Sequence, residues 1–297
     1  LTNSLKGVKT FLILGGERLE MVDPTPHLNK RYGSATELGK GIDVNEQVIS
    51  LLSRKSIRVF KDKRISRKLL ETLIACSQSA PTKSNLQQYS IIVVEDPSVR
   101  ARLAPWCPRT KIIESVPGLV VFCADLRRNR QIGEFAGKKN KNNNMDSFLN
   151  AAVDGALALG YFVAGAEAAG LGCAPLSSLR DSIHGVSEVL ELPSGVFPIA
   201  GVMFGWPDTE GYVNQRLPQG AVVHYNTYDD TDLAKHISNY DQIRHSAHAV
   251  PPERQQKTDL YGVTEPYFWS EHISRQLSVP ERAEFRSYLE QNGFALR

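Results

Sequence analysis

A short run of cations around a hydroxyl is the first part of the chain whose residue types suit a specific chemistry. The run consists of Arg54, Lys55, Ser56 and Arg58. Guanidinium groups bind phosphate oxygens in pairs, an ammonium group adds positive charge, and a hydroxyl donates one further hydrogen bond. The run is therefore a candidate phosphate site, and a solvated basic turn is the alternative that the same residues allow.

A polar loop at residues 80–89 is the second candidate. Its amide side chains at Asn85 and Gln87 present both donors and acceptors, which match the alternating nitrogen and oxygen edge of a flavin pyrimidine ring. An ordinary helix-to-strand turn would contain similar residues. Neither motif decides the function alone.

Periodic apolar positions predict the helices that border these two motifs. Asp43 or Asn45 caps a helix that ends near Leu52, and a second helix runs from Ser66 to about Ser77. The basic run lies in the turn between them. Both motifs are thus placed at the ends of predicted helices.

Short apolar runs predict three buried strands, at residues 89–95, 119–124 and 199–204. A long helix is predicted over residues 146–169. Small residues occur nearly all round this helix, which indicates that it lies in the core or at a subunit interface. Asp154 and Glu167 argue against a membrane span, since each would cost about 2.5 to 3.5 kcal/mol at a bilayer centre. Residues 173–180 are expected to form a loop.

Composition narrows the class of protein. The 297 residues are 41% hydrophobic and 23% charged, which is typical of a folded globular chain. A net charge of +3 is too small for a general nucleic-acid binder. The four cysteines include no Cys-x-x-Cys pair and no export signal is visible, so a reducing cytoplasm is expected. Residues 1–45 are predicted to be an extension or arm, and residues 138–144 a solvated polar loop.

The order of the motifs resembles the nitroreductase family. The pattern R-x-S-x-R-x-F at 54–60 is followed by A-P-T-x-x-N-x-Q-x-Y at 80–89 and then by an apolar strand. The resemblance covers roughly residues 46–297. The elements GWP at 205–207, RLP at 216–218 and WSEHI at 269–273 resemble the oxygen-insensitive NADPH nitroreductase and NADPH-flavin oxidoreductase branch.

This resemblance implies an α+β fold with a central, mostly antiparallel sheet flanked by helices, in a homodimer with one FMN in each of two sites built from both subunits. The implied activity is two-electron, ping-pong hydride transfer from NAD(P)H to nitroaromatics, quinones or free flavins. The flavin N5 itself carries the hydride, so no acid-base residue is expected. Arg58 would tune the ring. The implied FMN-binding residues are Arg54, Lys55, Ser56, Arg58, Ser84, Asn85, Gln87, Thr110, Pro175, Leu176, Ser177, Ser178, Leu179, Arg180 and Arg216.

The same resemblance implies NADPH as the electron donor. The related branch binds the 2′-phosphate with arginines of a flexible excursion, and Arg254 is the candidate in this chain. One departure is Asn214, where the branch usually has lysine; Lys55 or Lys83 would compensate. No metal, nucleic acid or membrane partner is expected. The alternatives are a reductase specialised for one dedicated substrate and a flavin-binding protein without catalysis.

Overall fold

The computed structural model describes residues 10–14 and 17–297, which group into two compact units. The first unit contains the described residues up to Arg54 together with Val213–Pro280, and the second contains Lys55–Tyr212 and Glu281–Arg297. The elements of the first unit are β1 (Thr10–Leu14), β2 (Glu17–Val22), α1 (Thr25–Tyr32), β3 (Val44–Asn45), α2 (Glu46–Leu52), α8 (Leu233–Ala247), α9 (Thr258–Tyr261) and α10 (Trp269–Leu277). The described part of the predicted extension, residues 1–45, therefore contains strands β1, β2 and β3 and helix α1.

The second unit is built on an antiparallel sheet whose strand order is β4-β5-β7-β6. Its elements are α3 (Arg67–Gln78), β4 (Tyr89–Val93), α4 (Pro97–Leu103), β5 (Gly118–Asp125), α5 (Arg127–Phe135), α6 (Met145–Ala168), β6 (Gly172–Leu176), α7 (Ile183–Val189), β7 (Val196–Gly205) and α11 (Phe285–Gln291). Every strand pair is antiparallel. The predicted α+β class and antiparallel sheet are confirmed.

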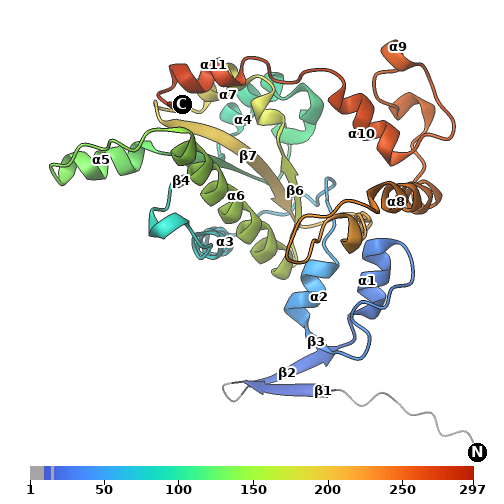
Figure 1. The fold of residues 1–297 in the computed structure, drawn as a ribbon. Helices are drawn as coiled ribbons and strands as arrows, with labels where there is room; N and C mark the ends of the chain where they lie inside the picture. Colours follow the sequence, from blue (N-terminus) through green and yellow to red (C-terminus); the bar gives the residue numbers. More distant parts are fainter. Residues whose placement is uncertain (1–9, 15–16) are drawn as a thin grey trace, which may run out of the picture. The chain divides into compact units, whose positions relative to one another are not determined.

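Helices cover both faces of this sheet (Figure 1). On one face, α3 and α6 pack Leu73 and Phe162 against Phe122 of β5. On the other face, α4 and α7 pack against the opposite side chains of the same strand. All eight residues of β5 are buried because both of its faces are covered, which is why residues 119–124 are continuously apolar rather than alternating.

Local capping explains where the predicted helices begin. The side chain of Asn45 accepts a hydrogen bond from the backbone N–H of Val48 at the start of α2, and Ser66 accepts one from Leu69 at the start of α3. Asn144 caps α6 in the same way. The predicted helix boundaries are therefore confirmed to within one or two residues.

The prediction of a loop at residues 173–180 is wrong in its first part, because Gly172–Leu176 form strand β6. This strand is at the edge of the sheet, and β7 is its neighbour among the strands of that sheet. Pro175 can occupy it because an edge strand has a side that needs no hydrogen-bond donors. The short length of the strand and its proline removed the usual sequence signal.

The long helix α6 is only partly buried. Its length and mean hydropathy of 1.4 would allow it to cross a membrane, yet it packs over the sheet with Asp154 buried at its centre. Its outer face carries apolar side chains that are between 37% and 55% exposed. These are Met145, Leu149, Val153, Leu157 and Tyr161.

Candidate functional site

The basic run after α2 continues along the edge strand β6. The backbone N–H of Ile57 donates to the carbonyl of Cys173 at 3.0 Å, and Ser56 pairs with Cys173 in a parallel bridge. A Cβ added at Gly172 would lie 2.6 Å from Ile57 Cβ, so this close approach requires glycine. Ile57 is buried in the core, so the backbone positions of its neighbours Ser56 and Arg58 are fixed. The side chain of Arg58 is exposed.

Asp154 fixes the polar loop that precedes β4. This carboxylate is 1% exposed and accepts hydrogen bonds from the backbone N–H groups of Lys83 at 2.9 Å and Gln88 at 3.0 Å. A buried charge requires such partners, because losing water costs several kcal/mol. The loop is therefore clamped at both ends by one side chain of α6.

The loop backbone between the clamped ends is left-handed at three non-glycine residues. The φ angles are 48° at Ser84, 56° at Asn85 and 51° at Gln87. Such backbone costs of order 1 to 3 kcal/mol per residue and persists only where its surroundings impose it. The side-chain amide of Gln87 donates to the Asn85 side-chain oxygen at 3.2 Å, and all three side chains are exposed. The loop thus presents preorganised polar groups at the surface.

Helix α5 supports the same loop from its outer side. Arg128 donates to the carbonyls of Gln87 at 3.0 Å and Tyr89 at 2.8 Å, and the Asn129 amide donates to the carbonyl of Leu86 at 3.2 Å. Sequence reasoning missed these supports and Asp154, because the partners lie 39 to 71 positions away along the chain. The requirement that a buried Asp be paired was the one signal that could have identified Asp154.

The residues after β6 turn back over the sheet. Thr110 Oγ1 lies 2.9 Å from Ser178 Oγ, so these two predicted residues are direct neighbours. Leu176, Ser178 and Leu179 are buried, so these residues can reach a ligand mainly through their backbone. Among the described residues, no acceptor contacts the backbone N–H of Ser177 or Ser178. Two adjacent donors are therefore available to a ligand.

Asp181 anchors the end of this turn. Arg109 donates to its carboxylate through two nitrogens at 2.8 and 2.6 Å, and this hydrogen bonding raises the pKa of Arg109. Arg282 donates to the other carboxylate oxygen at 3.1 Å and lies 3.3 Å from Ser177 Oγ. The segment is thus tied to two arginines from distant parts of the unit, neither of which the sequence indicated.

The side chain of Arg180 is hydrogen-bonded to the sheet. Its guanidinium donates to the carbonyl of Ile199 in β7, and burial lowers its pKa. Arg282 nearby lowers it further. The charge of Arg180 therefore holds the turn against β7.

The thiol of Cys107, next to the turn, is not a nucleophile at neutral pH. Cys107 is buried beneath Ser178, and burial together with the charge of Asp181 raises its pKa to about 11. A thiol with this pKa remains protonated and unreactive. Within the part of the chain that the structure describes, no group of three His, Cys, Asp or Glu residues could hold a metal ion.

In the first unit, a buried arginine organises the two remaining phosphate candidates. Arg31 of α1 donates to the carbonyls of Leu52 at 2.7 Å and Arg54 at 2.9 Å, and to the carbonyl of Asn214 at 2.8 Å. Its own carbonyl accepts from the backbone N–H of Arg216 at 2.9 Å. Arg54 and Arg216 therefore lie on either side of Arg31. Sequence reasoning missed Arg31 because it lies in the segment predicted to be an extension.

The segment that carries Arg254 is a well-packed loop. Arg275 of α10 is 3% exposed and donates to the carbonyl of Gly262 at 2.6 Å and to Thr264 Oγ1 at 2.5 Å. Gln255, the neighbour of Arg254, exchanges two hydrogen bonds with the backbone of Thr264 at 2.8 and 3.0 Å. Arg254 itself is exposed at the end of a short helical turn. The structure thus gives this cation a fixed backbone.

The candidates in the second unit fall into two groups. Ser56, Thr110 and Ser177–Arg180 belong to the β6 edge, whereas Ser84–Gln87 precede β4 at the opposite edge. Three strand spacings separate these edges, which is about 14 Å. One chain therefore does not bring the two groups side by side at a single edge.

Comparisons with known proteins identify the family to which this chain is similar. Residues 51–206 match the Nitroreductase family, and residues 214–297 match the Nitroreductase family, C-terminal domain. The chain is 35% identical over 204 residues to the FMN reductase [NAD(P)H] of Bacillus subtilis, covering 67% of this chain and 81% of that protein. It is 31% identical to the oxygen-insensitive NADPH nitroreductase of Salmonella typhimurium, covering 83% and 97%. The structure of the NADPH:FMN oxidoreductase from Vibrio harveyi complexed with NAD+ superposes with a TM-score of 0.75 at 28% identity, covering 85% and 100%.

Proposed function

Because the chain belongs to the nitroreductase family, we propose that residues 46–297 form an FMN-binding domain that uses NAD(P)H to reduce nitro compounds, quinones or free flavins. The protein is an oxidoreductase, and FMN and NAD(P)H are its cofactors. Residues 1–45 are proposed to be an N-terminal extension of that domain. We place the protein in the cytoplasm.

The observation that carries this proposal is the set of unused donors along the β6 edge. FMN combines a phosphate with a ring whose edge presents nitrogen and oxygen acceptors. Among the described residues, no carboxylate forms an ion pair with Arg58, and no acceptor contacts the backbone N–H of Ser177 or Ser178. Within the described ranges 10–14 and 17–297, Lys55 Nζ donates to the carbonyl of Glu210 at 2.8 Å and has no carboxylate partner. These donors fit an anionic cofactor with acceptors along its ring.

Each group has a distinct part in the proposed site. Bound FMN supplies the hydride chemistry, while the protein orients it and adjusts its charge. Arg54, Lys55, Ser56 and Arg216 would bind the phosphate and ribityl chain. Arg58 would place positive charge beside the N1 and O2 edge of the ring. Two opposite unit charges about 4 Å apart attract each other by about 4 kcal/mol at an effective dielectric near 20, before the cost of desolvation is subtracted. The ring itself would be lined by Ser84, Asn85, Gln87, Thr110, Pro175, Leu176, Ser177, Ser178, Leu179 and Arg180.

A homodimer follows from the separation of the two groups. If Ser84, Asn85 and Gln87 line the same ring as Ser177 and Ser178, the two sheet edges must come from different subunits. The outer face of α6 supplies an apolar surface for the second copy. Its exposed side chains recur every four residues, so they form one continuous stripe along the helix.

Charges placed in this stripe are expected to separate the subunits. Leu149 and Val153 are 55% and 46% exposed, so the pair Leu149→Arg and Val153→Arg leaves the core intact while burying two unpaired cations in the dimer. Sedimentation at micromolar concentration should show a dimer for the parent and a monomer for this variant. The matched pair Leu149→Met and Val153→Ile should remain dimeric. A parent protein that sediments as a monomer and still holds FMN would contradict the proposed two-subunit site.

NADPH is expected to be the better donor, because exposed Arg254 would contact its 2′-phosphate. Surface ion pairs are screened by salt, and the Debye length is about 8 Å at physiological ionic strength. The preference in kcat/KM for NADPH over NADH should therefore shrink as salt rises, and Arg254→Ala should reduce it more than Arg254→Lys. Double-reciprocal plots with a quinone acceptor should give the parallel lines of a ping-pong mechanism. A salt-independent preference for NADH would reject the role of Arg254 without affecting the flavin assignment.

A further inference from the structure

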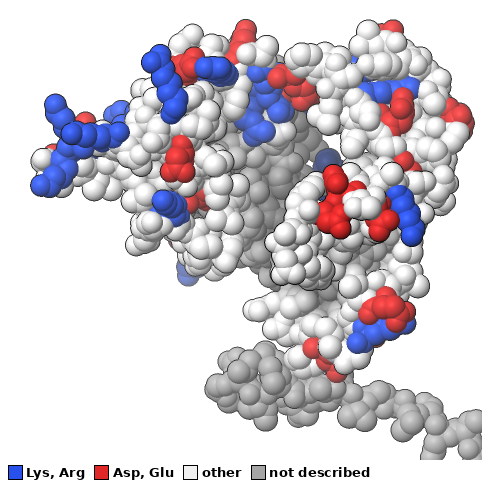
Figure 2. Space-filling model, in the orientation of Figure 1, with Lys and Arg blue, Asp and Glu red and all other residues white. Residues whose placement is uncertain are grey.

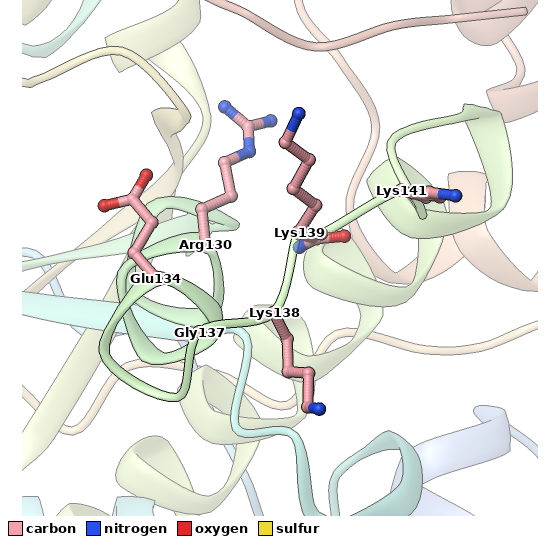
Figure 3. Close-up of a pocket in the computed structure, with 7 residues that line it drawn as sticks. Arg130, Glu134, Gly137, Lys138, Lys139 and Lys141 are labelled. Carbon is pink, nitrogen blue, oxygen red and sulfur yellow. The ribbon is translucent and has the colours of Figure 1, made fainter.

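The connection from α5 to α6 borders an open, basic pocket that the proposed flavin site does not use. The pocket has a volume of about 490 Å³ and is formed by α5 and residues 137–141 (Figure 3). Its charged lining consists of Arg130, Glu134, Lys138, Lys139 and Lys141. Four cations thus surround one carboxylate. Figure 2 shows this end of the molecule as a group of Lys and Arg side chains over α5.

These four cations lack ion-pair partners among the described residues. In the part of the chain that the structure describes, no carboxylate lies within ion-pair distance of the pocket's arginine or its three lysines. The paired arginines elsewhere in the unit provide a contrast: Arg67 contacts Glu71, and Arg286 contacts Glu290. Like charges brought together without partners repel one another, and an anion in the pocket would remove that cost.

The backbone that carries the cations is fixed at both ends. The N–H of Lys138 donates to the carbonyl of Gly133 at 2.7 Å, and a Cβ at Gly133 would lie 2.9 Å from the carbonyl oxygen of Lys138. At the other end, Ser147 Oγ donates to the carbonyl of Asn142 at 2.8 Å. The predicted solvated loop at 138–144 is therefore tied down next to α5 and α6.

Arg130 forms the rigid side of the pocket. One guanidinium nitrogen, Nη2, donates to the carbonyl of Gly293 at 2.7 Å and to the Asn143 side-chain oxygen at 3.2 Å. Within the described residues, its Nε and Nη1 atoms have no hydrogen-bond acceptor. In Figure 3 the side chain of Lys139 extends in the same direction as Arg130, whereas Lys138 extends to the opposite side of the loop. Arg130 and Lys139 are thus the pair placed to share one anion.

We propose that this pocket binds a small molecule that carries a polyphosphate chain. Its volume falls in the range of about 300 to 1,000 Å³ that is usual for sites of nucleotide-sized ligands. A guanidinium that is already oriented binds two phosphate oxygens, and lysines add point charges along the chain. The four cations and the one carboxylate sum to +3, whereas a monophosphate carries about −2, so a longer phosphate chain compensates the charge more completely.

The test compares two neighbouring lysines in protein saturated with FMN, so that the flavin site is occupied. Calorimetric titration at physiological salt should detect ATP and inorganic tripolyphosphate, while AMP should bind far more weakly. Lys139→Gln should weaken binding of both polyphosphates roughly five- to tenfold, as expected for one lost charge-assisted contact. Lys138→Gln, which removes the same charge from the same loop, should change it less than twofold. Thermal unfolding would check that both variants are folded.

Comparing the affinities for ATP and for tripolyphosphate also shows which kind of polyphosphate the pocket recognises. Tighter binding of ATP than of tripolyphosphate indicates a nucleotide ligand, and equal binding indicates recognition of the phosphate chain alone; both support the pocket. If Lys138→Gln and Lys139→Gln reduce the affinity for polyphosphate equally, the ligand is attracted only by the net charge of the loop, and the proposal is overturned. No binding of either polyphosphate at millimolar concentration would overturn it as well, as would binding only of single-stranded RNA or anionic vesicles. A protein that does not bind FMN is titrated without it, and the comparison of Lys138→Gln with Lys139→Gln decides the proposal in the same way, so failure of the flavin assignment remains distinguishable from failure of this pocket.

Discussion

Arg58→Ala and Arg216→Ala should each weaken FMN binding roughly 10- to 150-fold. Each substitution removes a charge-assisted contact to the cofactor, and such contacts contribute about 1.5 to 3 kcal/mol. Both side chains are exposed, so neither change creates a cavity in the core. Fold stability should therefore change little, and the effect should appear in the dissociation constant of FMN measured by fluorescence quenching.

Arg64→Ala is the matched control for this pair. Arg64 is exposed and lies six positions after Arg58, outside the motif, so its removal changes net charge by the same amount. We expect its FMN dissociation constant to stay within twofold of the parent value. Dissociation constants equal to the parent's for both Arg58→Ala and Arg216→Ala would remove these residues from the site.

Asp154→Ala should produce the largest loss of stability among the changes considered. The substitution leaves the buried N–H groups of Lys83 and Gln88 without an acceptor, and each unsatisfied donor costs about 1 to 3 kcal/mol. We expect the free energy of unfolding in urea to fall by about 2 to 5 kcal/mol. FMN binding should also weaken in the protein that remains folded, because the loop with its left-handed residues loses the clamp that imposes its shape.

Two further variants separate the clamp from general damage to α6. Asp146→Ala removes a carboxylate from the exposed first turn of the same helix and should cost less than about 1 kcal/mol. Asp154→Asn keeps the shape and one acceptor oxygen, so its loss of stability should lie between those of the other two. If Asp154→Ala unfolds at the same urea concentration as the parent, the clamp does not hold the loop.

Local sequence signals predicted the elements whose causes are local. The caps at Asn45 and Ser66 and the apolar run of β5 depend on neighbouring residues, and the structure places them as predicted. The family resemblance supplied the motif residues, and the family itself is confirmed by the matches over residues 51–206 and 214–297. What it could not supply was the set of contacts that hold them.

The contacts that shape the candidate site are almost all long-range. Asp154 reaches residues 66 and 71 positions away, and Arg282 reaches Ser177 over 105 positions. No periodicity or spacing encodes such pairs, because they arise only when the sheet brings distant segments together. The strand β6 was missed for a related reason, since an edge strand containing proline is stabilised by its pairing with β7 rather than by its own composition.

The most direct test of the account is an anaerobic titration of the purified, FMN-reconstituted protein with NADPH. The account predicts a yellow protein that binds one FMN per chain, bleaches on addition of one equivalent of NADPH and recovers its colour when a quinone is added. A protein that fails to bind FMN, or whose bound flavin stays oxidised in the presence of excess NADPH and NADH, would contradict the proposed function.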